Sequence, residues 1–112
     1  MLNPYKIIDD SLGTLEIKRY FIECDGNEEC FIVFYSYSEV DTFCIDDRSE
    51  KTLMYFQIDI FDKDIDFKFI NKVKEILKRS GFIEVAIGPD LYHEELELYQ
   101  KPLRFLFNLD NN

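Results

Sequence analysis

Residues 53–81 carry the clearest alternation of hydrophobic and polar positions in the chain. Apolar side chains first occupy every second position, which is typical of a strand with one buried face. This face would consist of Met54, Phe56, Ile58 and Ile60. After Asp62 the apolar residues recur every three or four positions, which predicts an amphipathic helix. Its apolar side would consist of Phe69, Ile70, Val73, Ile76 and Leu77. We therefore expect a central strand followed by a helix.

The predicted helix has signals at both of its ends. Asp64 or Asp66 can accept hydrogen bonds from the unpaired amides of the first turn. Lys78 and Arg79 complement the negative end of the helix dipole. Gly81 follows them and suits the left-handed conformation that commonly ends a helix. The start and stop signals therefore agree with the periodicity.

The N-terminal part of the chain predicts one helix and two strands. Asn3 and Pro4 are a cap and a first-turn proline for a short helix that Gly13 ends. Residues 14–24 alternate imperfectly and predict a strand. The sequence Asp25-Gly26-Asn27 is a turn signal, and the β-branched and aromatic residues 30–40 predict the next strand. We expect these two strands to form a hairpin.

Two polar segments separate the remaining strands. Residues 39–51 carry five acids and two bases, so we expect a long, solvated hairpin connection or arm. Its apolar residues Phe43 and Ile45 are either held against the core or part of a subunit contact. Residues 82–87 predict a short strand, and residues 91–102 predict a long loop. The last strand, residues 103–109, would bury Leu103, Phe105, Phe107 and Leu109.

This order of elements predicts one α+β domain over residues 1–112. We expect two layers, namely a mostly antiparallel sheet of four to five strands with two helices packed on one face. A right-handed parallel pairing of the strands on either side of the second helix is also compatible with the pattern. A chain of this length can form a core without disulfide bonds or metal ions.

Composition and charge narrow the classes of function. Acids outnumber bases 23 to 13, giving a net charge of -10, which argues against unaided binding to nucleic acid. Aromatic residues make up 16% of the chain, so we expect some rings to face a partner. Cys24, Cys30 and Cys44 lack the spacing of a zinc or redox motif and are expected to be reduced thiols. Neither a membrane span nor a signal peptide is recognisable, so we expect a soluble protein made inside a cell.

The sequence offers little catalytic chemistry. His93 is the only histidine, and no serine, threonine or cysteine has a recognisable triad context. The acid pairs Asp46/Asp47, Glu94/Glu95 and Asp62/Asp64 suit Mg²⁺ or Ca²⁺ in principle, but none fits an EF-hand loop. We therefore predict that the protein is not an enzyme and uses neither a cofactor nor a metal.

Three segments together resemble a known family. They are YFQIDIFDK at residues 55–63, KRSGF at residues 78–82 and GPDLYHEELELYQKPLRFLF at residues 88–107. In their order and spacing these segments are similar to the small tail-completion proteins of long-tailed bacteriophages and prophages, also called tail terminators or tail-to-head joining proteins. The resemblance covers about residues 30–109, and the N-terminal 29 residues match less well.

The resemblance implies a structural function. Proteins of that family form a ring on the tail tube, stop its polymerisation and present a surface to the head-tail connector. The partners implied are other copies of the chain, the tail tube protein and the connector protein, first in the host bacterial cytoplasm and then in the virion tail. The residues that match the family's loop-and-strand pattern are Asp90, Leu91, Tyr92, Glu94, Tyr99, Lys101 and Arg104.

Two loops are therefore the candidate contact regions for subunits or partners. A ring with a heterologous interface needs two different complementary patches on each subunit. The candidate residues outside the family pattern are Phe43, Ile45, Asp46 and Asp47. The alternative function is a small acidic binding protein or inhibitor, such as a DNA mimic that occupies the basic groove of a host nucleic-acid enzyme.

Overall fold

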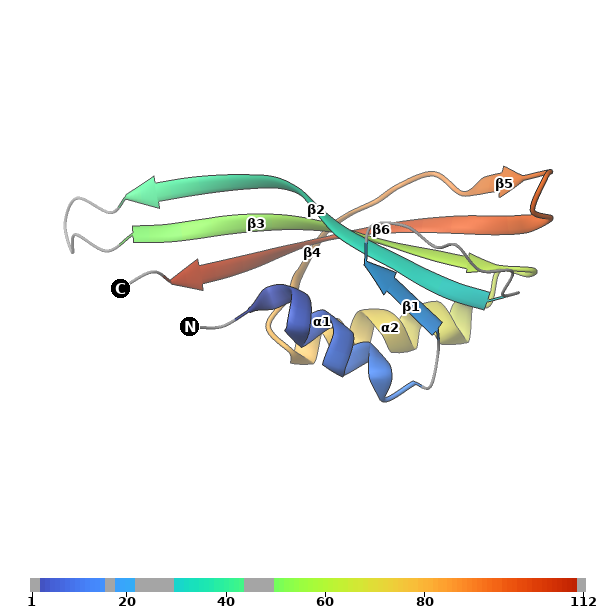
Figure 1. Ribbon diagram of the computed structural model, residues 1–112, viewed down its shortest axis with the longest axis horizontal. Helices are drawn as coiled ribbons and strands as arrows, with labels where there is room; N and C mark the ends of the chain where they lie inside the picture. Colours follow the sequence, from blue (N-terminus) through green and yellow to red (C-terminus); the bar gives the residue numbers. More distant parts are fainter. Residues whose placement is uncertain (1–2, 16–17, 22–29, 44–49, 111–112) are drawn as a thin grey trace.

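The structure is a computed structural model that describes residues 3–15, 18–21, 30–43 and 50–110. The elements are α1 (Pro4–Gly13), β1 (Lys18–Phe21), β2 (Cys30–Phe43), β3 (Glu50–Asp62), α2 (Phe67–Arg79), β4 (Ile83–Ile87), β5 (Leu91–His93) and β6 (Leu98–Asp110). The strands form one sheet in the order β1-β2-β3-β6-β4, and β5 pairs with β6. Both helices lie against the same face of this sheet (Figure 1). The predicted two-layer α+β fold is confirmed.

The sheet is mostly antiparallel, as predicted. Strand β3 pairs antiparallel with β2 and β6, and β6 pairs antiparallel with β4 and β5. The exception is β1, which runs parallel to β2. The hairpin predicted for these two strands is therefore wrong, because a turn signal is local and does not fix the direction of the following strand. Asp25-Gly26-Asn27 itself lies outside the described residues.

The parallel pairing considered across α2 does not occur. Strand β6 lies between β3 and β4 and is antiparallel to both. The C-terminal strand therefore separates the two strands that α2 connects. The last strand of the chain is a central strand of the sheet.

Residues 39–43 and 50–51 of the acidic segment are strand, so the connection predicted over residues 39–51 is too long. Strand β2 continues to Phe43, strand β3 begins at Glu50, and these two residues are paired. The polar side chains are compatible with a strand because those of Glu39 and Asp41 are exposed. The Thr52 hydroxyl donates a hydrogen bond of 2.8 Å to Asp41. Ile45, Asp46 and Asp47 lie outside the described residues.

The loop predicted at residues 91–102 is also wrong, because β5 and the first residues of β6 form a hairpin there. Leu91, Tyr92 and His93 pair with Gln100, Tyr99 and Leu98, respectively. Leu98 is buried in a small cluster with Phe31 and Val33 of β2. This long-range contact holds the start of β6 on the sheet, and the neighbouring sequence gives no sign of it.

The main core lies between the helices and the sheet. The alternation predicted for β3 is confirmed, since its buried residues are Met54, Phe56, Ile58 and Ile60. From β6 the core receives Leu103, Phe105 and Phe107. The helices contribute Ile8, Leu12, Ile70, Val73 and Leu77. Phe56 lies at the centre of this layer, where its ring makes edge contacts with the rings of Tyr5 and Phe82.

The predicted signals at the helix ends are confirmed. Asn3 caps α1 by accepting a hydrogen bond of 3.1 Å from the amide of Tyr5. Of the two aspartates proposed for α2, Asp66 is the cap and accepts from the amide of Phe69. Gly81 has a φ of 101°, the left-handed conformation expected after a helix end. The helices are joined where the hydroxyl groups of Ser11 and Ser80 lie 2.7 Å apart.

Strands β2 and β4 are irregular. Strand β2 has a bulge between Ser36 and Ser38, and β4 has one between Glu84 and Ala86. Strand β1 pairs only with residues Phe31–Phe34 of β2. Among the described residues, β2 therefore has no neighbour on that side beyond Phe34.

Candidate interaction surfaces

The β5–β6 hairpin contains most of the residues that the sequence assigned to partner contacts. Two pairs of them contact each other. The Lys101 amine lies 2.8 Å from the Asp90 carboxylate, and the rings of Tyr92 and Tyr99 are 4.8 Å apart between their centroids. Leu91 and Glu94 are exposed. Asp90 and Lys101 therefore brace the base of the hairpin, while its exposed side chains remain available for a partner.

The turn of this hairpin presents a second group of exposed residues. They are Glu94, Glu95, Leu96 and Glu97, which we call the hairpin tip. Leu96 is 58% exposed between acids, and Glu97 adopts a left-handed φ of 56°. Glu95, Leu96 and Glu97 are not among the predicted contact residues. The available signal was an apolar residue isolated within a run of acids, which we interpreted only as part of a long loop.

The structure describes only part of the second predicted contact region, which comprises Phe43, Ile45, Asp46 and Asp47. The backbone of Phe43 ends β2, where it pairs with Glu50. Ile45, Asp46 and Asp47 are outside the described residues. Their assignment as contacts therefore stays a prediction.

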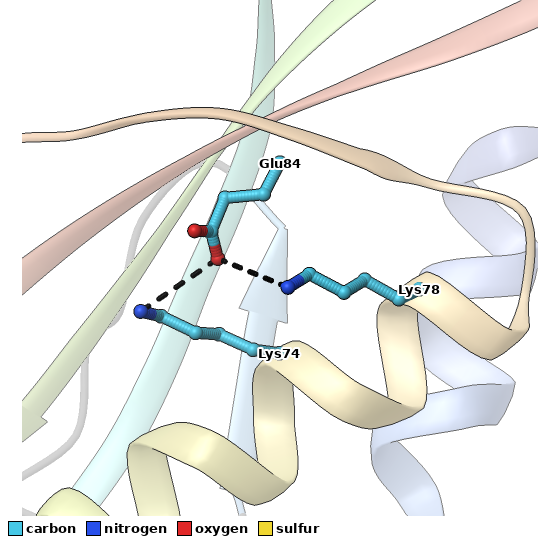
Figure 2. A network of polar contacts seen from close by, with 3 residues as sticks. All are labelled: Lys74, Lys78 and Glu84. Carbon is cyan, nitrogen blue, oxygen red and sulfur yellow. Dashed lines mark ion pairs between the residues drawn. The ribbon is translucent and has the colours of Figure 1, made fainter.

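Helix α2 carries an uneven distribution of positive charge. Five of the 13 basic residues of the chain lie in this helix together with a single acid, Glu75. Figure 2 shows two of them, Lys74 and Lys78, directed towards Glu84 of β4. Their amines lie 3.6 and 3.9 Å from the same carboxylate oxygen. Arg79 pairs with Glu75. Each positive charge of the C-terminal half therefore has a carboxylate partner within the chain, although Lys74 and Lys78 share one.

The N-terminal half of α2 differs from the C-terminal half. Its exposed residues are Phe67, Lys68, Asn71 and Lys72, which we call the α2 patch. Phe67 is 70% exposed, and neither Lys68 nor Lys72 forms an ion pair with any acid in the described part of the chain. The sequence analysis did not assign Phe67. Phe67 lies outside the apolar side of the helix, and this position in the sequence pattern indicates an exposed aromatic ring.

A row of polar side chains crosses the sheet face opposite the helices. The Arg104 side chain lies over the Tyr37 ring, 5.7 Å from its centroid, and donates to the Gln57 amide oxygen. Gln57 in turn donates a hydrogen bond of 3.0 Å to Asp59. Arg104 is thus placed by Gln57 and Tyr37. This face also leaves Tyr37 substantially exposed, which is compatible with contact to a partner.

Asp59 is the buried member of this row, with 4% of its surface exposed. Burial raises the pKa of its carboxyl group, and hydrogen bonds from Gln100 and Gln57 offset part of that effect. A raised pKa in the folded state means that the ionised carboxylate opposes folding. The carboxyl's contribution to stability is therefore fully present below its ordinary pKa and is lost as the pH rises through the raised value.

We expect the substitution Asp59→Asn to reveal this pH dependence. The free energy of unfolding of the wild type, minus that of the variant, should increase as the pH is lowered from 7 towards 4, because only the wild type gains a proton at this position. Urea unfolding of both proteins at several pH values measures the difference. A difference that is constant with pH, or that decreases on acidification, would contradict the raised pKa.

Two other titratable residues considered in the sequence, His93 and Cys30, contact neighbouring side chains. The His93 ring lies 2.6 Å from the Gln100 amide oxygen and packs beside the ring of Phe61. Cys30 is a free thiol, and burial, followed by the charge of Asp62, raises its pKa to about 11. The thiol is therefore protonated at neutral pH and a poor nucleophile. Cys24 and Cys44 are outside the described residues.

The described residues offer neither a metal cluster nor a membrane-spanning helix. They contain no group of three or more histidine, cysteine, aspartate or glutamate side chains arranged to hold a metal ion. No helix among them has the length and apolar character needed to cross a bilayer.

Comparison with known proteins gives similarities of structure and none of sequence. No protein family and no curated protein matches the sequence. The structure is similar to a chain in the virion of a native gene transfer agent (GTA) particle, with a TM-score of 0.60 and 10% sequence identity. The alignment covers 96% of this chain and 92% of that chain. The two chains therefore share a fold over nearly their whole lengths, and the resemblance to tail-completion proteins stays a prediction.

Proposed function

We propose that this chain is a structural virion protein that caps the tail tube and joins it to the head-tail connector, acting as a ring. The observation that carries the proposal is the similarity over 96% of the chain to a component of a gene transfer agent virion. The sequence pattern of residues 55–63, 78–82 and 88–107, which resembles tail-completion proteins, supports the same function independently.

The shape of the molecule suits assembly into a ring. The chain measures 52 × 26 × 25 Å along its principal axes, and three long strands form most of its length (Figure 1). Exposed apolar and aromatic side chains lie on several elements, among them Tyr37 of β2, Ile83 of β4 and Tyr92 of β5. A heterologous ring requires different contact surfaces on each subunit, and such scattered surfaces meet that requirement.

The charge of the chain suits a component of a channel that conducts DNA. With a net charge of -10, the chain does not retain phosphates by non-specific attraction. In this proposal the protein is not an enzyme and needs no cofactor. Its partners are copies of itself, the tail tube protein and the head-tail connector protein. It acts in the host bacterial cytoplasm during assembly and afterwards in the virion tail.

Purified tail tubes test the proposed function. Tubes grown in the presence of the protein should stop at a fixed length and carry extra density at one end in electron micrographs, because the bound ring blocks further addition of tube subunits. Tubes grown without the protein are the control. Tubes that continue to grow and show bare ends in its presence would refute the capping function.

A pull-down experiment separates this function from the inhibitor alternative. Recovery of tail tube and connector proteins supports the proposed function. Recovery of a basic nucleic-acid enzyme, with binding that weakens strongly as salt is added, would instead support an acidic inhibitor.

A further inference from the structure

The α2 patch has features that the stability of the helix does not explain. The Asp66 carboxylate caps α2, yet the first turn itself contains Lys68 and no acid. Phe67 beside it leaves 70% of its surface in solvent. Positions 67, 68, 71 and 72 are spaced so that they share one side of the helix. The helix therefore presents an aromatic ring together with two lysines that lack an ion pair among the described residues.

The hairpin tip has the complementary features. It presents a single exposed leucine, Leu96, surrounded in sequence by Glu94, Glu95 and Glu97. None of these three carboxylates forms an ion pair with a described residue. The tip combines an apolar anchor with negative charge, as the α2 patch combines an apolar ring with positive charge. Such a match of both properties favours one specific pairing.

The two surfaces do not neutralise each other within one molecule, since no ion pair between them is found among the described residues. We propose that the hairpin tip of one copy of this chain binds the α2 patch of the next copy. Leu96 then packs on Phe67, and the tip carboxylates pair with Lys68 and Lys72. In the proposed ring each copy directs its hairpin tip to one neighbour and its α2 patch to the other, so the contact is heterologous and repeats from copy to copy.

This pairing deepens the proposed function, because it supplies the subunit contact of the ring on which that function rests. The opposite charges of the hairpin tip and the α2 patch favour a second copy of the chain as the binding partner. The chain as a whole is strongly acidic, yet Lys68 and Lys72 lie together on one side of α2 without an ion pair among the described residues, opposite in charge to the hairpin tip. A head-to-tail contact uses both surfaces of every subunit.

Charge reversal on each surface tests the pairing. The tip variant is Glu94→Lys with Glu95→Lys, and Glu97 is retained because of its left-handed backbone. The patch variant is Lys68→Glu with Lys72→Glu. We expect each variant alone to associate with itself about a hundredfold more weakly than the wild type, because like charges then face each other. Sedimentation velocity over a concentration series at low salt measures the association, and circular dichroism verifies folding.

An equimolar mixture of the two variants is the decisive sample. In the mixture the reversed tip of one variant faces the reversed patch of the other, and the remaining unchanged surfaces also match. We therefore expect the mixture to recover association close to that of the wild type. The mixture has the same mean net charge as the wild type, so recovery does not arise from a change in overall repulsion.

Matched single substitutions control for charge and for the apolar contact. Lys6→Glu and Asp10→Lys change exposed residues of α1 and should leave association unchanged, whereas Lys72→Glu and Glu95→Lys should weaken it. Phe67→Ser and Leu96→Ser should each weaken association about tenfold or more without altering the charge.

The outcomes separate this inference from the proposed function. Wild-type protein that stays monomeric at its highest soluble concentration, or a mixture that does not recover association, overturns the pairing. If both variants still cap tail tubes as well as the wild type, the pairing is wrong while the capping function stands. If the wild type does not cap tubes, the capping function fails, and the mixing experiment on the purified protein still decides the pairing.

Discussion

Replacing Phe56 with alanine is expected to lower the free energy of unfolding by about 3–5 kcal/mol. The Phe56 side chain is fully buried, and its ring contacts Tyr5 of α1 and Phe82, the residue before β4. Its removal leaves a cavity where the sheet meets the layer of helices. Since small domains are stable by only about 5–15 kcal/mol, this loss should be a large fraction of the total.

Urea unfolding followed by far-ultraviolet circular dichroism measures this effect. The matched control is Phe67→Ala, which removes the same side chain from a position that is 70% exposed. The control should remain within about 0.5 kcal/mol of the wild type. Equal stabilities of the two variants would show that Phe56 is not the centre of the core.

The second large effect is expected from Leu98→Ala. Leu98 is 5% exposed and lies with Phe31 and Val33 on the sheet face opposite the helices. Its truncation should cost about 2–5 kcal/mol. The loss should be concentrated in the β5–β6 hairpin, because this leucine is the buried anchor that holds the hairpin against β2.

Hydrogen exchange locates that loss. In Leu98→Ala, the amides of Leu91–His93 and of the paired start of β6 should exchange faster, while those of α2 should change less. Leu96→Ala is the matched control on the same hairpin, because Leu96 is 58% exposed and its truncation should leave exchange unchanged. Uniform acceleration across the whole domain would contradict a local anchoring function for Leu98.

The centre of the fold was predictable because its sequence signals are local and consistent. The period of two in β3 and the period of three to four in α2 identify these elements and their buried sides. Asp66 and Gly81 then mark the ends of the helix. Each of these signals depends on residues that are close together in the chain. They required no knowledge of the remainder of the structure.

The errors occurred where distant residues decide the structure. Residues 39–43 have the composition of a loop, but pairing with β3 makes them strand, and their acids are tolerated at exposed positions. Residues 91–93 and 98–102 are strand because Leu98 is buried beside residues of β2. The parallel direction of β1 likewise depends on its partner and not on the turn signal.

The candidate contact residues were predictable only as a region. The segment from Asp90 to Lys101 does form an exposed projection, but Asp90 and Lys101 pair with each other. Leu96 and Phe67 were missed because exposure depends on the completed fold. The spacing of apolar residues shows which of them can lie on the same side of a helix or strand. Whether an apolar residue elsewhere on that element is exposed depends on the elements that pack around it.

The bulges in β4 and in the part of β2 beyond its pairing with β1 bear on how the protein avoids indiscriminate aggregation. An uninterrupted outer strand offers a regular ladder of amides and carbonyls to any extended polypeptide. The bulges around Tyr37 and Val85 break that ladder and bend the strands, so that another polypeptide can pair with only a short length of each edge. We therefore expect these two edges to resist pairing with other extended chains.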